Sequence, residues 1–149
     1  MILPPAVIKK ILSCAEAACP AECCGLVSKS DALEMRVWPI RNIQDEKHRE
    51  VPEKFPRTAK EAYWMDPAEL LRAQKQMRQN AARLFVIYHS HTNGEAYFSA
   101  EDERLALDEF GEPLYPDVFY FVIPVKNSKA SEGIFFKWNP EFKKFSSYS

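Results

Sequence analysis

An apolar run near the middle of the chain ends in a pair of histidines, Leu84-Phe85-Val86-Ile87-Tyr88-His89-Ser90-His91. Five consecutive apolar residues are too hydrophobic for a strand with one solvated face, so they predict a central strand that is covered on both sides. Side chains at positions i and i+2 of a strand project from the same face. His89 and His91 can therefore offer imidazole nitrogens to one ion at the strand end, while Ser90 points away.

Ser99 and Asp102 follow the histidines after a short loop and stand three residues apart. Their S-x-x-D spacing is typical of a helix-capping box, which by itself requires no chemistry. A helix that begins beside the strand end would also hold Asp102 where it faces both histidines, so the two interpretations are compatible. Two histidines and a carboxylate suit zinc, and three protein ligands leave the fourth tetrahedral position to a catalytic water.

Helical and strand patterns interleave along the rest of the chain without strict alternation. The spacing predicts helices over residues 4–18, 67–80 and 99–109, and strands over residues 23–28, 33–40, 62–65, 84–88, 118–125, 133–138 and 142–145. Residues 41–60 are polar, charged and without clear period, which predicts a long loop, either ordered for function or partly disordered. We expect one domain over residues 1–149, an α/β or α+β sandwich with a curved mixed sheet and about three helices.

The composition disfavours several classes of function. A net charge of -1 gives no electrostatic argument for binding nucleic acid. Neither a signal peptide nor a membrane span is evident, so we expect a cytoplasmic protein without a membrane partner. The four cysteines lie close together in the first sixth of the chain and are expected to be free thiols, since their spacing suits neither a regular disulfide framework nor a standard zinc knuckle: Cys14, Cys19, Cys23 and Cys24.

The histidine region resembles a known family signature. His89-Ser90-His91, seven residues, Ser99, two residues and Asp102 match without a gap the H-S/T-H-x7-S-x2-D signature of the JAMM metalloproteases, also called the MPN-plus or Mov34 family. Upstream, Pro20-Ala21-Glu22-Cys23-Cys24-Gly25-Leu26 is similar to the P-x-E-x-C-G-L segment of standalone bacterial members. The similarity extends over roughly residues 5 to 125, and it implies the cytidine-deaminase-like MPN sandwich fold.

The resemblance also implies roles for individual residues. His89, His91 and Asp102 would hold one Zn²⁺ ion with its water, Glu22 would be the general acid/base, and Ser99 would stabilise the tetrahedral intermediate. These roles agree with the chemistry of the side chains, because zinc lowers the pKa of its water to about 7 and a nearby carboxylate can then take the proton.

The implied activity is that of a zinc-dependent peptidase or isopeptidase, which cleaves the amide bond after the glycine tail of a ubiquitin-like or sulfur-carrier protein. Two alternatives stay open, a non-catalytic MPN scaffold for protein–protein interaction and a zinc hydrolase of small amides or cell-wall peptides. Thr92 and Phe98 depart from the pattern, because most bacterial relatives have proline at both positions. We expect this to alter loop rigidity and substrate fit rather than metal binding, and Tyr97 and Phe98 are candidates for lining a groove.

Overall fold

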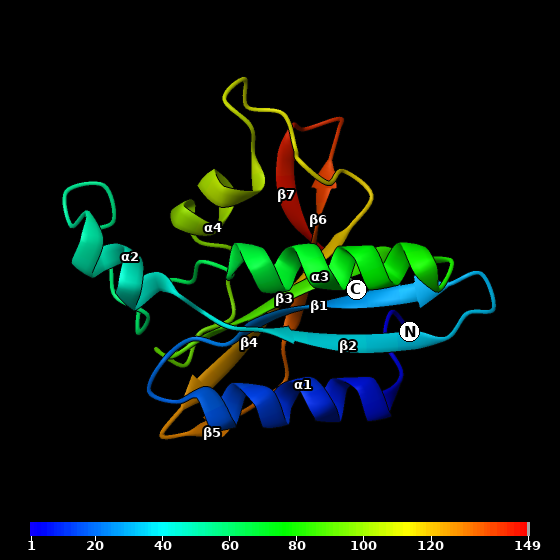
Figure 1. Cartoon of the computed structure of the whole chain (residues 1–149), viewed down its shortest axis with the longest axis horizontal. Coiled ribbons are helices and arrows are strands. Elements are labelled where there is room, and N and C mark those ends of the chain that lie inside the picture. The colour runs from blue at the N-terminus through cyan, green and yellow to red at the C-terminus, as the bar shows by residue number, and fades with distance from the viewer. Residues whose placement is uncertain (149) are drawn as a thin grey trace.

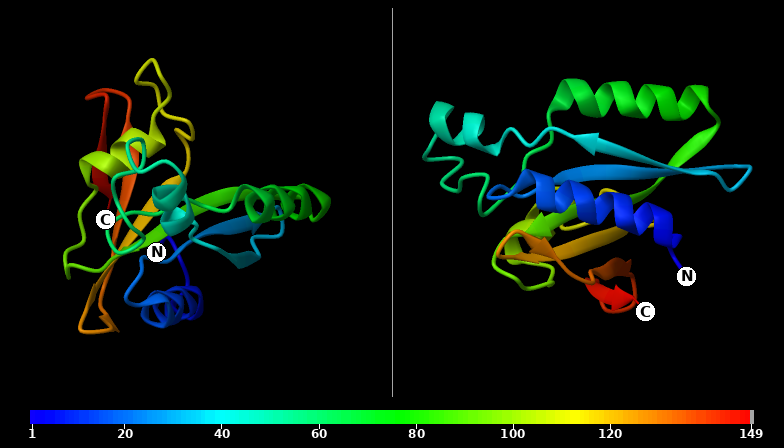
Figure 2. Two further views of the ribbon diagram at one scale, coloured as in Figure 1. Left: turned by 60° about the vertical axis from the view of Figure 1, so that its left-hand side comes forward. Right: turned by 90° about the horizontal axis from the view of Figure 1, so that it is seen from below.

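The computed structural model describes residues 1–148 and builds them around one seven-stranded mixed sheet (Figure 1). The strand order is β2-β1-β3-β4-β6-β7, with β5 paired to β4 beside this path. Only β3 and β4 run parallel to each other. The strands are β1 (Cys24–Ser30), β2 (Met35–Ile40), β3 (Ala82–His91), β4 (Phe119–Lys126), β5 (Lys129–Ala130), β6 (Ile134–Asn139) and β7 (Lys144–Tyr148). The sheet curves so strongly that β6 and β7 run across the direction of β1 and β2 (Figures 1 and 2).

Helices cover both faces of this sheet. The structure describes α1 (Pro5–Ala18), α2 (Gln44–Glu50), α3 (Pro67–Gln79) and α4 (Ala100–Ala106). Helix α1 packs on one face through Ile11 and Ala15, whereas α3 packs on the other through Ala73 and Met77 (Figure 1). Ala106 of α4 joins the α3 side of the core. The predicted mixed α/β fold and the covered central strand are therefore confirmed, and among residues 1–148 no helix has the length and hydrophobicity to cross a membrane.

The prediction of a long loop over residues 41–60 is wrong, because this segment contains helix α2. The helix has no apolar face and is held by polar contacts instead. Asn42 Oδ1 accepts from the Gln44 N–H at 3.0 Å, and the Gln44 side chain donates to the Arg57 carbonyl at 3.0 Å. Asp45 accepts from the Ala59 N–H at 2.8 Å. Hydrophobic periodicity could not detect such a helix, and it brings the count to four helices rather than about three.

Other boundaries also differ from the prediction. No strand forms over residues 62–65, where only Met65 makes an isolated bridge to Asn42. The helix expected over residues 99–109 ends at Ala106, because the chain turns back there to pair Leu107 with Pro113. The last strand begins at Lys144 rather than at residue 142, since a turn occupies residues 140–143.

The pairing of β1 with β3 places Glu22 beside the two histidines of β3. The two strands are antiparallel, with Cys24 opposite His89. Ser90 strengthens this register, because its N–H donates to the Cys23 carbonyl at 3.1 Å and its Oγ accepts from the Cys23 N–H at 2.8 Å. If the same register is continued for two residues before β1, Glu22 lies opposite His91.

Replacing Ser90 with alanine should lower the free energy of unfolding by about 1–3 kcal/mol, because the buried Cys23 N–H then loses its side-chain acceptor. Ser13→Ala, an exposed change on α1, should stay within about 0.5 kcal/mol of wild type. Urea unfolding of both variants measures the difference. Equal stabilities for the two variants would show that the Ser90 hydroxyl does not support the register.

Candidate metal centre

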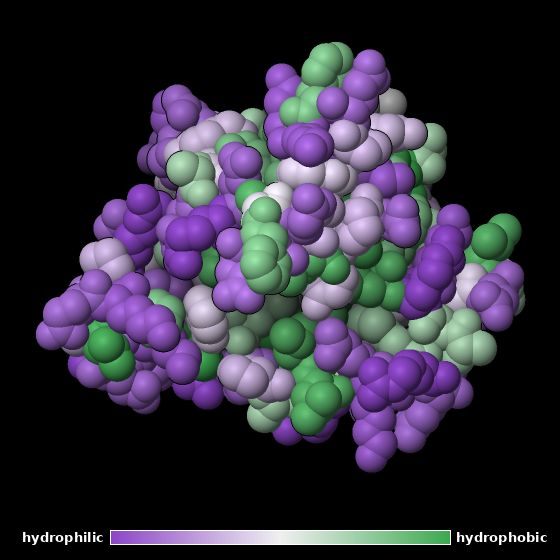
Figure 3. All heavy atoms as spheres, turned by 90° about the horizontal axis from the view of Figure 1, so that it is seen from above, coloured by the Kyte–Doolittle hydropathy of each residue, from purple (hydrophilic) through white to green (hydrophobic). Residues whose placement is uncertain are grey.

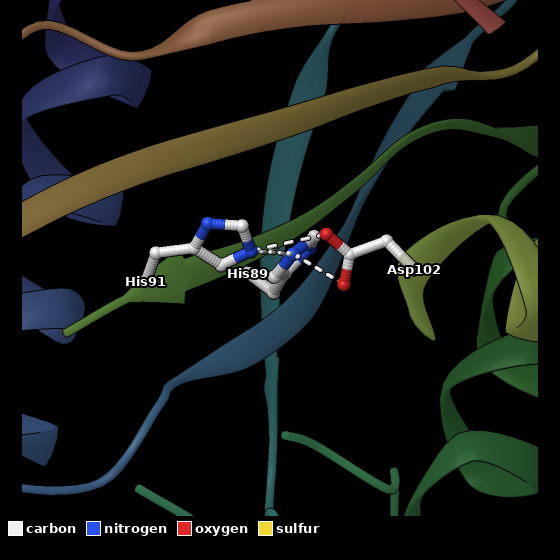
Figure 4. Close-up of side chains that lie close together, drawn as sticks. All are labelled: His89, His91 and Asp102. Atoms are coloured by element: carbon white, nitrogen blue, oxygen red, sulfur yellow. Dashed lines mark hydrogen bonds and ion pairs between the residues drawn. The ribbon is translucent and has the colours of Figure 1, made fainter. Parts of the chain in front are cut away.

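Three buried side chains meet where β3 ends and α4 begins (Figure 4). His89 and His91 project from β3, and Asp102 reaches them from the first turn of α4. The two Nε2 atoms are 3.1 Å apart, Asp102 Oδ1 is 3.1 Å from Nε2 of His89, and Oδ2 is 3.0 Å from Nε2 of His91. Within residues 1–148 this is the one group of three His, Cys, Asp or Glu side chains whose ligand atoms lie close enough together to hold a metal ion.

The geometry and protonation of this cluster fit a bound cation. Ligand atoms about 2.0–2.1 Å from a tetrahedral ion are about 3.3 Å from one another, close to the separations found here. His91 Nδ1 lies 3.2 Å from the Glu95 carbonyl, which can only accept a hydrogen bond. With Nδ1 donating to this carbonyl, Nε2 of the neutral ring is free to bind a metal ion beside His89 and Asp102. The converging polar atoms need a positive charge between them, which a bound metal ion would supply and which protons on the rings supply without it.

Ser99 and Asp102 form the predicted capping box at the start of α4. Ser99 Oγ accepts from the Asp102 N–H at 3.0 Å, and the Ser99 N–H donates to Asp102 Oδ2 at 2.9 Å. Burial by itself would raise the pKa of Asp102, but the charge on His89 and the hydrogen bonds from both rings and from Ser99 hold that pKa below its usual range. Asp102 is thus ionised at neutral pH, as a metal ligand must be.

Glu22 borders a cleft of about 320 Å³ that His91 and Ser99 also line. The residue is only 5% exposed, and burial, followed by the negative charge of Asp102, raises its pKa from 4.5 to about 9. Arg57 opposes this rise. A cation in the cleft would also lower the pKa, toward the range in which Glu22 can exchange a proton near neutral pH.

Two aromatic rings fix the orientation of the histidines. Tyr63 stacks on His89 with ring centroids 4.7 Å apart, and Tyr97 meets His91 edge-on at 4.8 Å. Tyr97 lines the cleft, as predicted. The same prediction for Phe98 is wrong, because its ring packs in an aromatic cluster of the core with Tyr120, Phe136 and Phe145.

No sequence pattern indicates the role of Asn42. Its side-chain amide donates to the carbonyls of Glu22 at 3.0 Å and Ala62 at 3.2 Å. Its oxygen accepts from the N–H groups of Gln44 and Trp64, both at 3.0 Å. Asn42 therefore ties the Glu22 backbone to α2 and to the segment before α3. Asparagine at the start of a polar segment is common, so only the folded chain reveals these contacts.

The four cysteines are free thiols, as predicted. Burial raises the pKa of Cys23 to about 12, so this thiol stays protonated and unreactive at neutral pH. Thr92, one of the two departures from the family pattern in the sequence, donates from its hydroxyl to the Lys60 carbonyl at 2.7 Å. This hydrogen bond joins the loop after β3 to residues 57–61.

Comparisons with known proteins agree with this fold. A family model described as prokaryotic homologs of the JAB domain matches residues 4–139. The chain is similar to the solution structure of protein DSY2949 from Desulfitobacterium hafniense, with 28% identity, a TM-score of 0.65, and coverage of 97% of this chain and 86% of that chain. A solution structure from Salinibacter ruber has a TM-score of 0.61 at 17% identity, covers 98% and 87% of the two chains, and is evidence for the fold alone. No curated protein matches the sequence.

Glu22→Gln should stabilise the metal-free protein, increasingly so as the pH rises. A folded-state pKa near 9 against an unfolded value of 4.5 means that folding favours the protonated acid. The stability that protonated Glu22 contributes to the wild type is then fully present below about pH 4.5 and is lost as the pH rises through about 9. Glutamine has no proton to lose, so the variant keeps its stability over this range.

The difference in unfolding free energy between Glu22→Gln and wild type should grow by a few kcal/mol between about pH 5 and 9, because each unit of pKa shift corresponds to about 1.4 kcal/mol. Urea unfolding in the presence of a chelator measures it, with Glu132→Gln as a matched change at an exposed position. A difference that stays constant with pH would mean that Glu22 is not held protonated.

Proposed function

Because this chain belongs to the family of prokaryotic JAB-domain homologues, we propose that it is a zinc-dependent peptidase or isopeptidase. Its substrate in this proposal is the amide bond that follows the C-terminal glycine tail of a ubiquitin-like or sulfur-carrier protein. One observation carries the proposal, namely that a buried His-His-Asp cluster borders, through His91, a cleft that is also lined by a buried glutamic acid of raised pKa. The free thiols of all four cysteines support action in a reducing compartment, the cytoplasm.

The side chains of the cleft have distinct tasks in this reaction. A zinc ion held by His89, His91 and Asp102 would supply Lewis acidity and would lower the pKa of water to about 7. Glu22 takes a proton from the attacking water and returns it to the leaving nitrogen. Ser99 Oγ accepts its hydrogen bond from the Asp102 N–H, so the hydroxyl proton is free to be donated to the developing oxyanion. The amide is hydrolysed without a covalent bond to the enzyme.

The dimensions of the cleft support a glycine tail as the substrate. Its volume of about 320 Å³ is small for a folded partner, and Glu22 at its side is nearly fully buried. Glycine has no side chain and lets an extended backbone approach the reactive groups closely. A glycine tail that extends from a folded carrier can thus enter where a bulkier chain would be excluded.

Zinc-reconstituted protein should cleave carrier fusions that end in Gly-Gly-X. Glu22→Ala should lower kcat by about 10²- to 10⁴-fold, because the proton acceptor is lost. Ser99→Ala should lower it by about 10²- to 10³-fold through loss of a donor to the oxyanion. Glu132→Ala, at an exposed position outside the cleft lining, is the control, and mass spectrometry of the products gives the rates.

The same assay separates the alternatives. Failure of the wild type to cleave any fusion, or full activity in Glu22→Ala, would contradict the proposed function. Zinc binding without cleavage would favour the non-catalytic scaffold. Cleavage of small amides or cell-wall peptides, with glycine-tailed proteins left intact, would favour the small-substrate hydrolase.

A further inference from the structure

His89 lacks the hydrogen bond that usually orients a metal-binding histidine. Such a ring normally donates its second N–H to a carbonyl or a carboxylate, which fixes its tautomer and its rotation. His91 has a partner of this kind, because its Nδ1 lies 3.2 Å from the Glu95 carbonyl. Nδ1 of His89 is buried and has no hydrogen-bond partner within residues 1–148. Another contact must therefore hold the His89 ring with Nε2 toward His91 and Asp102.

The ring of Tyr63 makes that contact. The two rings stack with their centroids 4.7 Å apart and their planes 28° from parallel, and a stacked ring opposes rotation of the imidazole. Tyr63 also lines an apolar pocket of about 290 Å³, together with Leu70 and Tyr120. The core therefore does not close around the whole Tyr63 ring. Its position depends on the backbone that carries it.

Asn42 fixes this backbone on both sides of Tyr63. The side-chain Nδ2 donates to the Ala62 carbonyl at 3.2 Å, and Oδ1 accepts from the Trp64 N–H at 3.0 Å. The main chain adds a bond from the Ile43 N–H to the Trp64 carbonyl at 2.8 Å. One side chain thus holds the residues before and after Tyr63, so the ring reaches His89 from a fixed point.

The same amide of Asn42 also holds Glu22. Nδ2 donates to the Glu22 carbonyl at 3.0 Å, and Oδ1 accepts a second bond from the Gln44 N–H at 3.0 Å. The side chain therefore makes two donor and two acceptor bonds, all with main-chain groups. An ionised aspartate of the same shape can only accept, so asparagine is needed to bind both kinds of group.

We propose that Asn42 and Tyr63 are positioning residues that hold the proton-transfer group and a metal ligand in one frame. Tyr63 orients His89 in place of a hydrogen bond, and Asn42 keeps Tyr63 and Glu22 at a constant separation. A misplacement of about 1 Å can cost an enzyme on the order of 10²-fold in rate. The role of Tyr63 rests on metal binding alone, whereas the role of Asn42 toward Glu22 rests on the proposed function.

Zinc affinity tests the role of Tyr63 without any substrate. In competition with a chromophoric chelator, Tyr63→Leu should bind zinc about 10- to 100-fold more weakly than wild type, as is typical when the partner of a ligand is lost. Tyr63→Phe keeps the ring and should stay within about threefold of wild type. Phe136→Leu removes a buried ring elsewhere in the core and should also keep the wild-type affinity, which separates orientation of the ligand from loss of stability.

Variants of Asn42 test the link to Glu22. At saturating zinc, Asn42→Ala should lower kcat for the Gly-Gly-X fusions by about 10- to 100-fold with little change in KM, and should weaken zinc binding by about tenfold. Asn42→Asp still accepts from the Gln44 and Trp64 N–H groups, so it should recover stability in urea unfolding but not kcat.

Asn139→Ala is the matched control for these variants. Asn139 also accepts from two main-chain N–H groups, those of Glu141 at 3.0 Å and Phe142 at 3.2 Å, and it lies outside the cleft lining. Its replacement should leave both zinc affinity and kcat unchanged. Full recovery of kcat in Asn42→Asp would mean that Asn42 supports the fold only, and would overturn its positioning role.

The zinc measurements distinguish failure of this inference from failure of the proposed function. Wild-type affinity in Tyr63→Leu, or an equal loss in Tyr63→Leu and Phe136→Leu, would overturn the role of Tyr63 even if the wild type cleaves the fusions. A loss confined to Tyr63→Leu, in a protein that cleaves no fusion, would support that role and overturn the proposed function alone. A wild type that binds no zinc would overturn both.

Discussion

Strand β1 pairs with β3 along its whole length, and Cys23, just before β1, extends the pairing to Ser90, which stands 67 residues away in sequence. A slip of one residue would turn both histidines of β3 to the other face and leave buried polar groups unpaired. Only this register therefore keeps both histidines on the face of Asp102 and the buried polar groups paired. It sets Glu22 opposite His91 and leaves the Glu22 N–H to bind the Ala59 carbonyl, so that the segment bearing Arg57 and Lys60 follows the same strand end.

Two carboxyl groups at this strand end are driven to opposite protonation states. Asp102 faces both imidazole rings and the N-terminus of α4, and its pKa falls below the usual range. Glu22 is buried without such partners, and its pKa rises to about 9. Environments that separate two carboxyl groups in this way assign them different chemistry. Asp102 has the properties of a metal ligand, and Glu22 those of a group that takes up and releases a proton.

Local patterns were sufficient to predict the groups that depend on local geometry. Strand alternation put His89 and His91 on one face, and the S-x-x-D spacing put Asp102 at the start of α4. Gly25, part of the upstream segment, is explained only by the fold, since a Cβ there would overlap the Tyr88 ring.

Other parts of the site depend on contacts between distant residues and could not be predicted. Helix α2 has no apolar periodicity and exists through polar contacts to Asn42, Arg57 and Ala59. Tyr63 stacks on His89 from residues 62–65, a segment that forms no strand although its composition favoured one. The short strand β5 forms only because it pairs with the end of β4. The surface seen from above shows a further feature that sequence could not reveal, a hollow bordered by apolar side chains within a largely hydrophilic face (Figure 3).

X-ray absorption spectroscopy at the zinc edge tests most directly whether His89, His91 and Asp102 hold one ion. The zinc-reconstituted protein should show about four nitrogen or oxygen neighbours at about 2.0–2.2 Å, with the scattering of two imidazole rings. His91→Ala should lose one imidazole contribution or fail to retain zinc. A shell of sulfur at about 2.3 Å would place the metal on the cysteines, and an unchanged spectrum in His91→Ala would place it elsewhere in the chain. Either result would contradict the assignment of these three residues as the metal centre.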